Sequence, residues 1–513
     1  MHIKSAINPS MLIISLLLSG LIIPCLASHN SYAYSLNLRG DIPLNEIAYD
    51  GIYQAIEHLQ NYGFFGGVDY YDRPFDFKDV RNDLLKINPD SLPYSALWEY
   101  NYIKRRLGLD ARPKGFHLRF DSGITFSGFG KIPTRFRFHP DIDYTIGNFY
   151  LESRYTIGSK SIAGEKYGGK VWGGVIGYGD LVYSSYRQNK IAVYLGRRKL
   201  EWGPNLTGSL ILSGKSMPYD GFSFNYNFRG NLKLSAFTFI LDPYQNVDGS
   251  YQERYLSGHR LTWEPKYKLT IGISEVVIYG GEGRNPEVYY FFPLFFLHGS
   301  QLNQGIDDNT LIEADFRWLP FSATEIYGQI LIDDFQIEKK TLEDNEPTEY
   351  GLLFGINRSE LPFMPYLQAG AEYVRIANRT YDQPLPRNKY INRGYYIGYP
   401  LGNDGDLFTA QLILRLKDKI KFTGEFSRQR KGEGRIENDW DTPWMDEPNY
   451  TEKFPTGTVQ TTNKFELIIE YAKNEHFISK VTAYRERITN KNHILNDNYS
   501  DNISMEFSID FLF

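Results

Sequence analysis

The chain has 513 residues, of which 42% are hydrophobic and 16% aromatic, and its mean hydropathy is -0.41. The formal net charge of -5 is spread along the chain, which excludes a polybasic nucleic-acid surface. A single cysteine, Cys25, excludes disulfide bonds within the chain. The 40 tyrosines and 34 phenylalanines favour strands whose faces meet two different environments, because tyrosine combines an apolar ring with a polar tip.

The first 33 residues have the layout of a secretory signal peptide. A lysine precedes an apolar run from residue 11 to 23, and small residues follow it. Cleavage after Ala27 or after Ala33 fits this layout, and either cut removes Cys25. The alternative, lipid attachment at Cys25, is disfavoured by the proline directly before it. The sequence therefore predicts an exported chain without a thiol.

Residues 41–110 predict three short amphipathic helices. The first lies in DGIYQAIEHLQNYG, with Asp50 as N-cap and Gly63 just past its end. The second begins at the cap residue Asp76, and the third opens at Ser91. Helices of this size cannot bury their apolar faces alone, so we expect them to pack on each other and on the body that follows, as a small periplasmic bundle.

From residue 114 to 513 the apolar pattern has a period of two. In the clearest hairpin, apolar residues occupy every second position before a polar turn at residues 417–419, and they resume the same face after it. The alternating residues of this hairpin are Phe408, Ala410, Leu412, Leu414, Leu416, Ile420, Phe422, Gly424 and Phe426. After the signal peptide, no apolar run is long enough to span a bilayer as a helix. A membrane protein without such helices must close its sheet into a barrel.

A soluble sandwich would also alternate apolar and polar residues, but the connection lengths favour a barrel. Counted back from the C-terminus, long connections (487–502, 430–462 and 377–406) alternate with short ones, as in outer-membrane barrels with tight periplasmic turns and long outer loops. The segments number about eighteen. The prediction is a closed antiparallel barrel in the bacterial outer membrane, in contact with its lipid.

The last strand, NISMEFSIDFLF, carries apolar residues at every second position and ends on Phe513. A barrel must pair this strand with its first strand. The terminal aromatic, together with Phe511 and Phe507, resembles the signal that the outer-membrane insertion machinery of bacteria reads.

The most distinctive internal stretch is YLGRRKLEWGPNLTGSLILS, residues 194–213. Taken alone, its Trp-Gly-Pro element indicates a corner where the strand through Glu201 ends. The stretch is similar to the motif G-R-x-x-x-x-W-G-P-x-x-x-G-S-L-x-L-S of the Wzi-like capsule-assembly family of outer-membrane lectins. The matching residues are Gly196, Arg197, Trp202, Gly203, Pro204, Gly208 and Ser209, followed by Leu210, Leu212 and Ser213.

Further stretches resemble the same family in order, and together with the helical leader they span most of the mature chain. They are SGHRLTWEP, ISEVVIYGGEG, QGIDDNTLIEADFRW and YGQILIDDFQ. The resemblance implies a barrel of about eighteen strands with a helical bundle at its periplasmic mouth, which associates with capsular or exopolysaccharide and helps to organise a capsule. It does not imply which sugar is bound.

The long connection after Arg430 has the composition of a carbohydrate site. Aromatic rings pack on the C–H faces of sugars, while carboxylates and amides hydrogen-bond hydroxyls. The candidate residues are Trp440, Trp444 and Tyr450 with Asp439 and Asp441. An interfacial aromatic belt, or a loop folded over the lumen, explains the tryptophans equally well.

Arg428, Arg430 and Arg435 cluster at the start of the same connection. Arginine makes bidentate contacts with the carboxylates of acidic sugars, although a charged cluster is more often a solvated rim.

No catalytic, metal or cofactor signature is present. Asp333 and Asp334 are neighbours on a predicted strand and therefore point to opposite faces. The leading hypothesis is a non-enzymatic lectin-like barrel. The alternative is a diffusion porin, motivated by polar lumen-facing residues. A barrel hydrolase is a third hypothesis, which rests on the many carboxylates expected in the lumen.

Overall fold

The computed structural model describes residue 42 and residues 47–66, 71–107, 115–127, 134–162, 167–203, 206–266, 268–292, 297, 307–334, 345–416, 419–447, 449–474, 476–496 and 499–512. The predicted signal peptide, Pro204 and Phe513 lie outside these residues. Among the helices described, none is long and apolar enough to cross a membrane.

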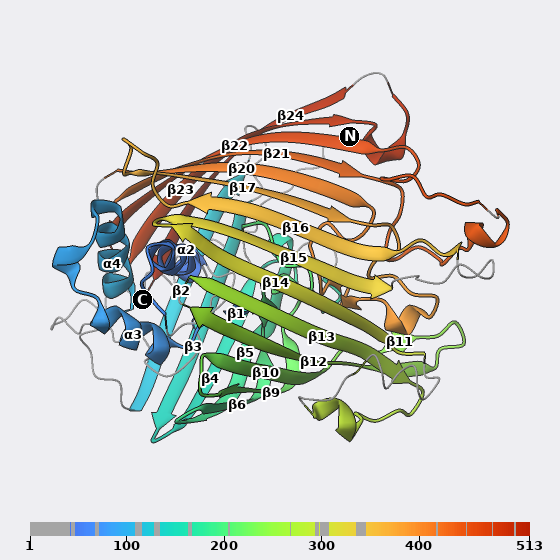
Figure 1. Ribbon diagram of the computed structural model, residues 1–513, viewed down its shortest axis with the longest axis horizontal. Coiled ribbons are helices and arrows are strands. Elements are labelled where there is room, and N and C mark those ends of the chain that lie inside the picture. The colour runs from blue at the N-terminus through green and yellow to red at the C-terminus, as the bar shows by residue number, and fades with distance from the viewer. Residues whose placement is uncertain are drawn as a thin grey trace.

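Within the described residues, eighteen strands form a closed antiparallel barrel (Figure 1). The strands are β2 (Gly115–Ser127), β3 (Thr134–Ile146), β4 (Phe149–Ser159), β5 (Val175–Gln188), β6 (Ile191–Arg198), β9 (Tyr219–Asn227), β10 (Leu232–Ile240), β12 (Tyr251–Lys266), β13 (Leu269–Gly281), β14 (Asn309–Phe321), β15 (Thr324–Asp334), β16 (Glu349–Arg358), β17 (Leu367–Ile376), β20 (Gly405–Leu416), β21 (Ile420–Lys431), β22 (Gln460–Asn474), β23 (Phe477–Thr489) and β24 (Tyr499–Leu512). The barrel prediction is confirmed.

The last strand closes the barrel. β24 pairs with β2 in a register that sets Phe507 opposite Phe126 and Phe511 opposite Ser122. The Phe511 ring contacts Phe477 on β23, with 5.5 Å between centroids. Pairing on both sides satisfies the backbone groups that an open edge would expose. The reading of these aromatics by the insertion machinery stays a prediction.

Each strand turns one face to the outside and one to the lumen. On β20, Phe408, Leu412 and Leu416 are exposed, whereas Thr409 and Ile413 between them are buried. Exposed apolar residues on the outside of a closed sheet are what a lipid environment requires.

Long and short connections alternate at the two ends, as expected. Short turns join β20 to β21 and β22 to β23, while residues 377–404 and 432–459 form long loops at the other end. We call the end with the long loops the outer end and the opposite one the periplasmic end. The connection between β23 and β24 is shorter than expected, because their ladder continues to the pair Thr489 and Tyr499.

Two inward-folded segments, residues 199–203 with 206–218 and residues 377–404, fill part of the lumen, and we call them the plug. In the first segment, β7 (Glu201–Trp202) pairs with β8 (Leu212–Ser213) and with β1 (Asp72–Arg73), which comes from the N-terminal region. The second contains η5 (Pro386–Asn388) and the pair β18 (Ile391–Asn392) and β19 (Tyr395–Tyr396). The plug and the inner wall share one hydrophobic core, which includes Trp202, Leu210, Phe237, Leu256, Tyr381 and Tyr399.

A strand does end at Trp202, as predicted, but it is not the strand that passes through Gly196. The barrel strand β6 already ends at Arg198, and Glu201 and Trp202 belong to a separate strand inside the lumen. Apolar alternation alone does not distinguish a strand that faces lipid from one that faces a packed interior.

Three helices, α2 (Ile47–Asn61), α3 (Phe77–Lys86) and α4 (Tyr94–Arg106), lie at the periplasmic end (Figure 1). We call residues 42–107 the cap. The cap has a hydrophobic core of its own, whose members include Ile52, Ile56, Leu59, Val80, Leu84 and Ile103.

The helix starts were predicted with mixed success. Asp76 caps α3, where its carboxylate accepts hydrogen bonds from the backbone N–H groups of Lys78 and Asp79. Asp50 is not a cap, because α2 begins three residues earlier. Ser91 ends the short helix η1 (Pro89–Ser91), and α4 starts only after Pro93, since the residue before a proline is held in an extended conformation.

One loop packs on the outside of the wall. The short helix η3 (Val288–Phe291), together with Leu297, covers the outward side chains Tyr255, Val277 and Tyr279 on β12 and β13. Asp308 anchors this loop by accepting hydrogen bonds from Arg284 and from the hydroxyl of Tyr290 at 2.8 Å.

Candidate functional site

The two loops at the outer end meet at Arg379. Its guanidinium lies 2.5 Å from the Asp441 carboxylate and donates a 2.8 Å hydrogen bond to the Asp441 backbone carbonyl. It also lies over the rings of Trp440 and Trp444, at 5.2 and 4.7 Å from their centroids. Because Arg379 belongs to the plug, these contacts hold the segment from Trp440 to Trp444 against the plug.

Further contacts bind the same two loops together. Lys389 donates to the backbone carbonyl of Asn438 at 2.5 Å. The Tyr396 hydroxyl donates to the Glu437 carboxylate at 3.0 Å. Burial raises the pKa of Tyr396, and the nearby Glu437 carboxylate raises it further. The loop that carries the candidate tryptophans thus rests on the plug.

The predicted aromatic residues form one cluster but differ in exposure. The Trp440 and Trp444 rings meet edge to face at 6.3 Å, and Trp444 lies 6.5 Å from Tyr450. Trp444 is only 3% exposed, whereas Trp440 and Tyr450 are partly exposed. Burial and the neighbouring Glu452 raise the pKa of the Tyr450 hydroxyl to about 12. Trp440 is therefore the tryptophan of this cluster that a ligand can reach directly.

The two predicted carboxylates, Asp439 and Asp441, flank Trp440 in the chain. Asp439 and Asn449 are exposed, and the side chain of Asp441 is 74% exposed although it pairs with Arg379. Carboxylates and amides at the edge of an aromatic ring provide acceptors and donors for hydroxyl groups. Trp440, Asp439, Asp441 and Asn449 form what we call the loop site.

The three predicted arginines do not lie together in this site. Arg428 and Arg430 are on β21 with their side chains on the outer wall, where Arg430 donates to Asp406 at 2.9 Å. Arg435 donates 2.7 Å hydrogen bonds to the backbone carbonyls of Gly432 and Gly434 and also contacts His493. The expected basic cluster at the start of the loop is thus divided between the wall and the loop backbone.

The family motif lies mainly in the plug. Trp202 donates from Nε1 to the Asp72 carboxylate at 3.0 Å, and Glu201 pairs with Arg73 at 2.8 Å. Gly203 has a φ of +125°, and a Cβ there would approach Gln329 to 2.2 Å. Because this glycine leaves room, Gln329 reaches from β15 to accept the N–H of Leu210 at 3.1 Å.

The remaining motif residues also make packing or ionic contacts within the barrel and the plug. Ser209 is fully buried, and Gly208 packs against Pro400 and Tyr399 of the second plug segment. A Cβ on Gly196 would meet the carbonyl of Val182 at 2.3 Å, and Arg197 forms a two-pronged contact with Asp220 on the outer wall. Most residues of the motif therefore hold the plug against the inner wall of the barrel.

The sequence did not predict the two tyrosines that hydrogen-bond to the motif segment. Tyr381 and Tyr390 donate to the carbonyls of Leu210 and Ile211 at 2.6 and 2.7 Å. The tyrosines and glycines of residues 392–406 signalled an unusual loop, but no local pattern indicated that it turns inward.

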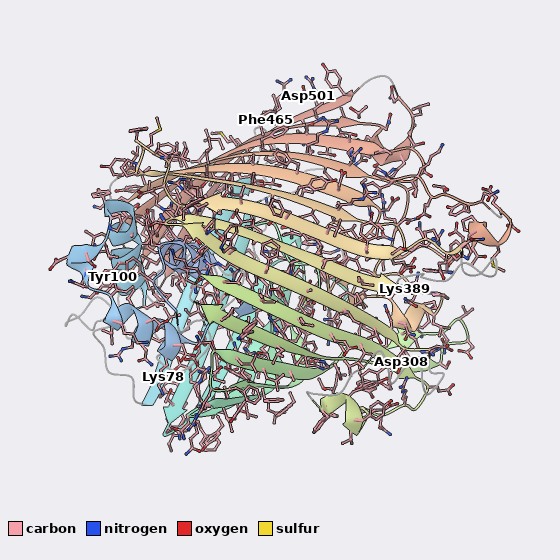
Figure 2. All side chains as sticks on the ribbon, in the orientation of Figure 1. Lys78, Tyr100, Asp308, Lys389, Phe465 and Asp501 are labelled. Atoms are coloured by element: carbon pink, nitrogen blue, oxygen red, sulfur yellow. The ribbon has the colours of Figure 1, made fainter. Side chains whose placement is uncertain are left out.

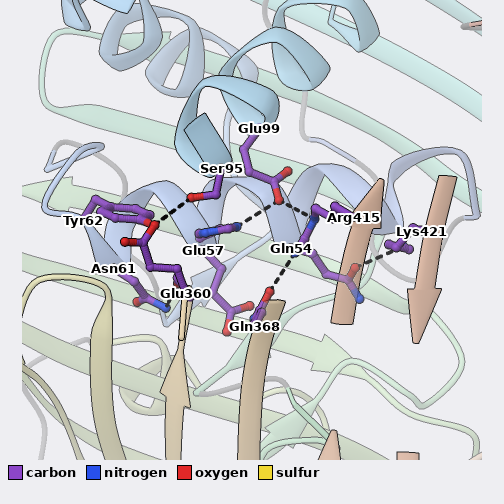
Figure 3. Close-up of polar contacts among 12 residues, drawn as sticks. Gln54, Glu57, Asn61, Tyr62, Ser95, Glu99, Glu360, Gln368, Arg415 and Lys421 are labelled. Carbon is purple, nitrogen blue, oxygen red and sulfur yellow. Dashed lines mark hydrogen bonds and ion pairs between the residues drawn. The ribbon is translucent and has the colours of Figure 1, made fainter. Parts of the chain in front are cut away.

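The cap is fixed in the periplasmic mouth mainly by polar contacts (Figure 3). Glu99 lies 2.7 Å from Arg415 on β20 and 2.9 Å from His58 on α2. Asn61 donates to Ser359 at 3.1 Å, and Tyr62 donates to Glu360 at 2.5 Å. On the opposite side, Arg187 of β5 holds Asp76 and Asp79 at 3.0 and 2.8 Å.

The carboxylates in the wall show no shared catalytic geometry. The side chain of Asp333 is buried toward the lumen and accepts the N–H of Tyr381 at 2.6 Å, while its neighbour Asp334 belongs to the other face. Among the described residues, no three His, Cys, Asp or Glu side chains gather where a metal ion could bind.

Comparison with known proteins assigns the chain to a family. The family model described as capsule assembly protein Wzi matches residues 180–501. The chain belongs to this family. No curated protein sequence matches it.

The structural comparison agrees on the fold. The solved structure of Wzi from Escherichia coli, described as a carbohydrate-binding β-barrel involved in group 1 capsule assembly, has a TM-score of 0.64 at 15% identity. The match covers 93% of this chain and 99% of that one. OprD from Pseudomonas aeruginosa has a TM-score of 0.43 at 11% identity, with 78% of this chain and 94% of that one covered. The resemblance to the Wzi family is thus confirmed, and the chain is a barrel of the outer-membrane type.

Proposed function

We propose that this protein is a non-enzymatic lectin-like barrel that binds surface polysaccharide at its outer end and assists the assembly or attachment of a capsule. The observation that carries the proposal is the loop site, in which the partly exposed Trp440 ring is held by Arg379 among exposed carboxylates. Membership of a capsule assembly family and the carbohydrate binding described for Escherichia coli Wzi support it.

The negative charge of the loop narrows the class of sugar that the loop site can bind. Glu437, Asp439, Asp441, Asp446 and Glu447 are all exposed on this face. Carboxylates accept hydrogen bonds from hydroxyl groups but repel uronates. A segment of the polysaccharide rich in hydroxyls is therefore the better ligand for the loop site than a run of acidic sugars.

The test has two arms. In cells, deletion of the gene should shift polysaccharide from the cell-bound to the shed fraction. With purified folded protein on a glycan array, Trp440→Ala should weaken binding about tenfold, because one stacked ring is lost. Trp318→Ala is the matched control, since Trp318 is 47% exposed on the outer wall of β14, far along the strand from the loops. An unchanged cell-bound ratio, or equal binding by both variants, would contradict the proposal.

The diffusion porin remains the second candidate. Lumen-facing Lys464 and Glu466 on β22 keep side-chain exposures of 31% and 17%, so part of the lumen is hydrated. The plug and the cap oppose free passage, and planar-bilayer recordings of the purified protein should be silent. A steady open conductance would favour the porin.

A further inference from the structure

The outer wall formed by β17 and β20 to β24 contains a groove of about 780 Å³. Small residues, Ala410, Gly424 and Ala483, form its floor, and two rings border it, that of Phe465, which is 61% exposed, and that of Phe426, which is partly buried. A Cβ built on Gly424 would meet no atom within 4 Å, so the glycine opens onto free space.

The strand register places this groove on the outside of the barrel. Gly424 lies opposite Leu412 on β20 and Leu467 on β22, whose side chains are 50% and 48% exposed. The flanking residues Glu425 and Glu466 belong to the opposite face, which lines the lumen. Figure 2 shows Phe465 and Asp501 along the same edge of the barrel, away from the cap.

Arginines border the groove on its outer side. Arg428 of β21 lies opposite Asn463, and Asn463 lies opposite Arg487 of β23, so the three form one row across the sheet. Arg485 lines the groove itself, and its side chain is 54% exposed. Arg430 and Arg375 continue the basic surface in the next row.

Two aspartates and two rings hold this arginine surface in place. Asp501 contacts Arg485 at 3.0 Å and Arg487 at 3.7 Å, and Asp406 binds Arg430. Arg487 lies 4.0 Å from the centroid of the Tyr499 ring, and Arg375 lies 3.7 Å from that of Phe454.

Five arginines therefore face two aspartates, and the surface keeps an excess of positive charge. The side chains of Arg430, Arg485 and Arg487 remain 41%, 54% and 45% exposed. Arg428 is exposed as well.

We propose that this surface binds one phosphorylated, acylated lipid of the surrounding outer leaflet. The phosphate contacts Arg428, Arg485 and Arg487, whose guanidinium groups offer two parallel donors to phosphate oxygens. An acyl chain occupies the groove over Gly424. The spacing suits such a molecule, because Arg428 stands about 7 Å beyond Phe426 along β21, and the headgroup therefore lies directly above the chain.

The opposite wall shows why the site belongs to this side. There, η3 and Leu297 cover the outward residues of β12 and β13 near the outer end, so the chain supplies its own apolar cover. Over β17 and β20 to β24 the corresponding cover must come from lipid. Such a lipid would anchor the barrel independently of any polysaccharide on the loops.

The experiment uses the full-length folded barrel in a neutral detergent, with diphosphoryl lipid A as the probe and native mass spectrometry as the readout. The double variant R428Q/R487Q should lower apparent affinity at least tenfold, and Gly424→Leu, which fills the groove, should lower it about fivefold. The controls are Arg393→Gln, on an outer loop with a side chain 48% exposed, and Ala314→Leu, an added side chain on the exposed outward face of β14. Both should bind as the parent protein does.

Further probes separate the parts of the proposal. Phosphatidylcholine should bind weakly, because it has no net negative charge, and inorganic phosphate should compete weakly, because it has no acyl chain. Equal affinity of the parent, R428Q/R487Q and Gly424→Leu would overturn the proposal, as would inorganic phosphate that competes as well as the lipid. Arg428→Gln alone tests the charge if the double variant loses the folded form, which heat-modifiable gel migration reveals.

Discussion

The barrel is closed twice, and the two closures differ in how they are held. The plug shares a continuous hydrophobic core with the inner wall, in which Trp202 and Leu210 pack with Phe237 and Leu256. The helices of the cap bury their apolar residues among themselves, in a core of their own, whereas Tyr71, next to β1, joins the core of the plug. The contacts of these helices with the barrel are mainly ion pairs and hydrogen bonds, as at Glu99 and Arg415.

This difference teaches that the two closures have different stabilities. Removal of the plug would expose the core of the barrel wall, whereas removal of the cap would break polar contacts that water can replace. The strand β1 links them, because Asp72 and Arg73 pair with Trp202 and Glu201 of the plug. We therefore expect the plug and β1 to unfold only with the barrel, and the helices α2, α3 and α4 of the cap to open on their own.

The largest effect should follow from Trp202→Ala in the plug. Trp202 is 1% exposed and packs on Phe237 with 5.1 Å between ring centroids. Its loss leaves a cavity and should lower the free energy of unfolding by about 3 to 5 kcal/mol. Urea unfolding followed by gel migration measures this, with exposed Trp318→Ala as control. If both variants unfold at one urea concentration, the plug is not part of the barrel core.

The next largest effect should follow from Glu99→Gln in the cap. The change leaves the Arg415 charge without its carboxylate and should weaken docking of the cap by about 3 kcal/mol. Hydrogen exchange should accelerate in α2, α3 and α4 but not in β1 or the barrel strands. Asp90→Asn, an exposed acid of the same region, is the control. Faster exchange in the strands as well would show that cap and barrel unfold together.

A smaller effect is expected where the plug meets the outer loop. Arg379→Lys keeps the charge but loses the planar fork that holds Asp441 and covers Trp440 and Trp444. We expect a cost of about 1 to 2 kcal/mol, confined to the loop. Hydrogen exchange of residues 432–447 reports it. Unchanged exchange there would mean that the loop is ordered without Arg379.

The smallest effect concerns the pH dependence of the cap. Burial lowers the pKa of His58 below its ordinary value of 6.5, although Glu99 acts in the opposite direction. A ring released by opening takes up a proton more readily, so this stabilisation is complete above pH 6.5 and is lost as the pH falls through 6.5 towards the lower pKa of the buried ring.

Lowering the pH from 7.5 to 5.5 should therefore lower the free energy of cap opening by at most about 1.4 kcal/mol per pH unit. Exchange rates in the cap, divided by the intrinsic amide exchange rate at each pH, measure this free energy. Burial would raise the pKa of Glu99, but Arg415 and His58 hold it below its usual range, so protonation of Glu99 at still lower pH acts in the same direction. His58→Gln keeps a donor for Glu99 without the titration. A parent protein with the same opening free energy at both pH values would remove His58 from this role.

Local signals predicted the parts of the fold that local interactions form. The alternation around Phe408 and Leu412 indicated a strand with one face toward lipid, and the cap at Asp76 indicated the start of α3. The same signals failed at Asp50 and Ser91, since α2 already begins at Ile47 and Pro93 delays the start of α4.

The candidate site was predicted in composition but not in arrangement. The cluster of Trp440, Trp444 and Tyr450 could be anticipated, but the burial of Trp444 depends on Arg379, 65 residues earlier in the chain. Likewise, the separation of Arg428 and Arg430 from Arg435 depends on where β21 ends.

The sequence by itself determined that this chain folds as a closed antiparallel barrel with helices at its N-terminal side, because backbone groups in lipid must pair and the period-two pattern marks where they do so. Only the tertiary structure decided which apolar strand segments face lipid and which fill the lumen. Trp202 and Leu412 both follow a strand pattern, yet one is buried against Phe237 and the other is half exposed. Whether such a segment faces lipid or fills the lumen depends on the residues that it packs against, and these lie far away in the chain.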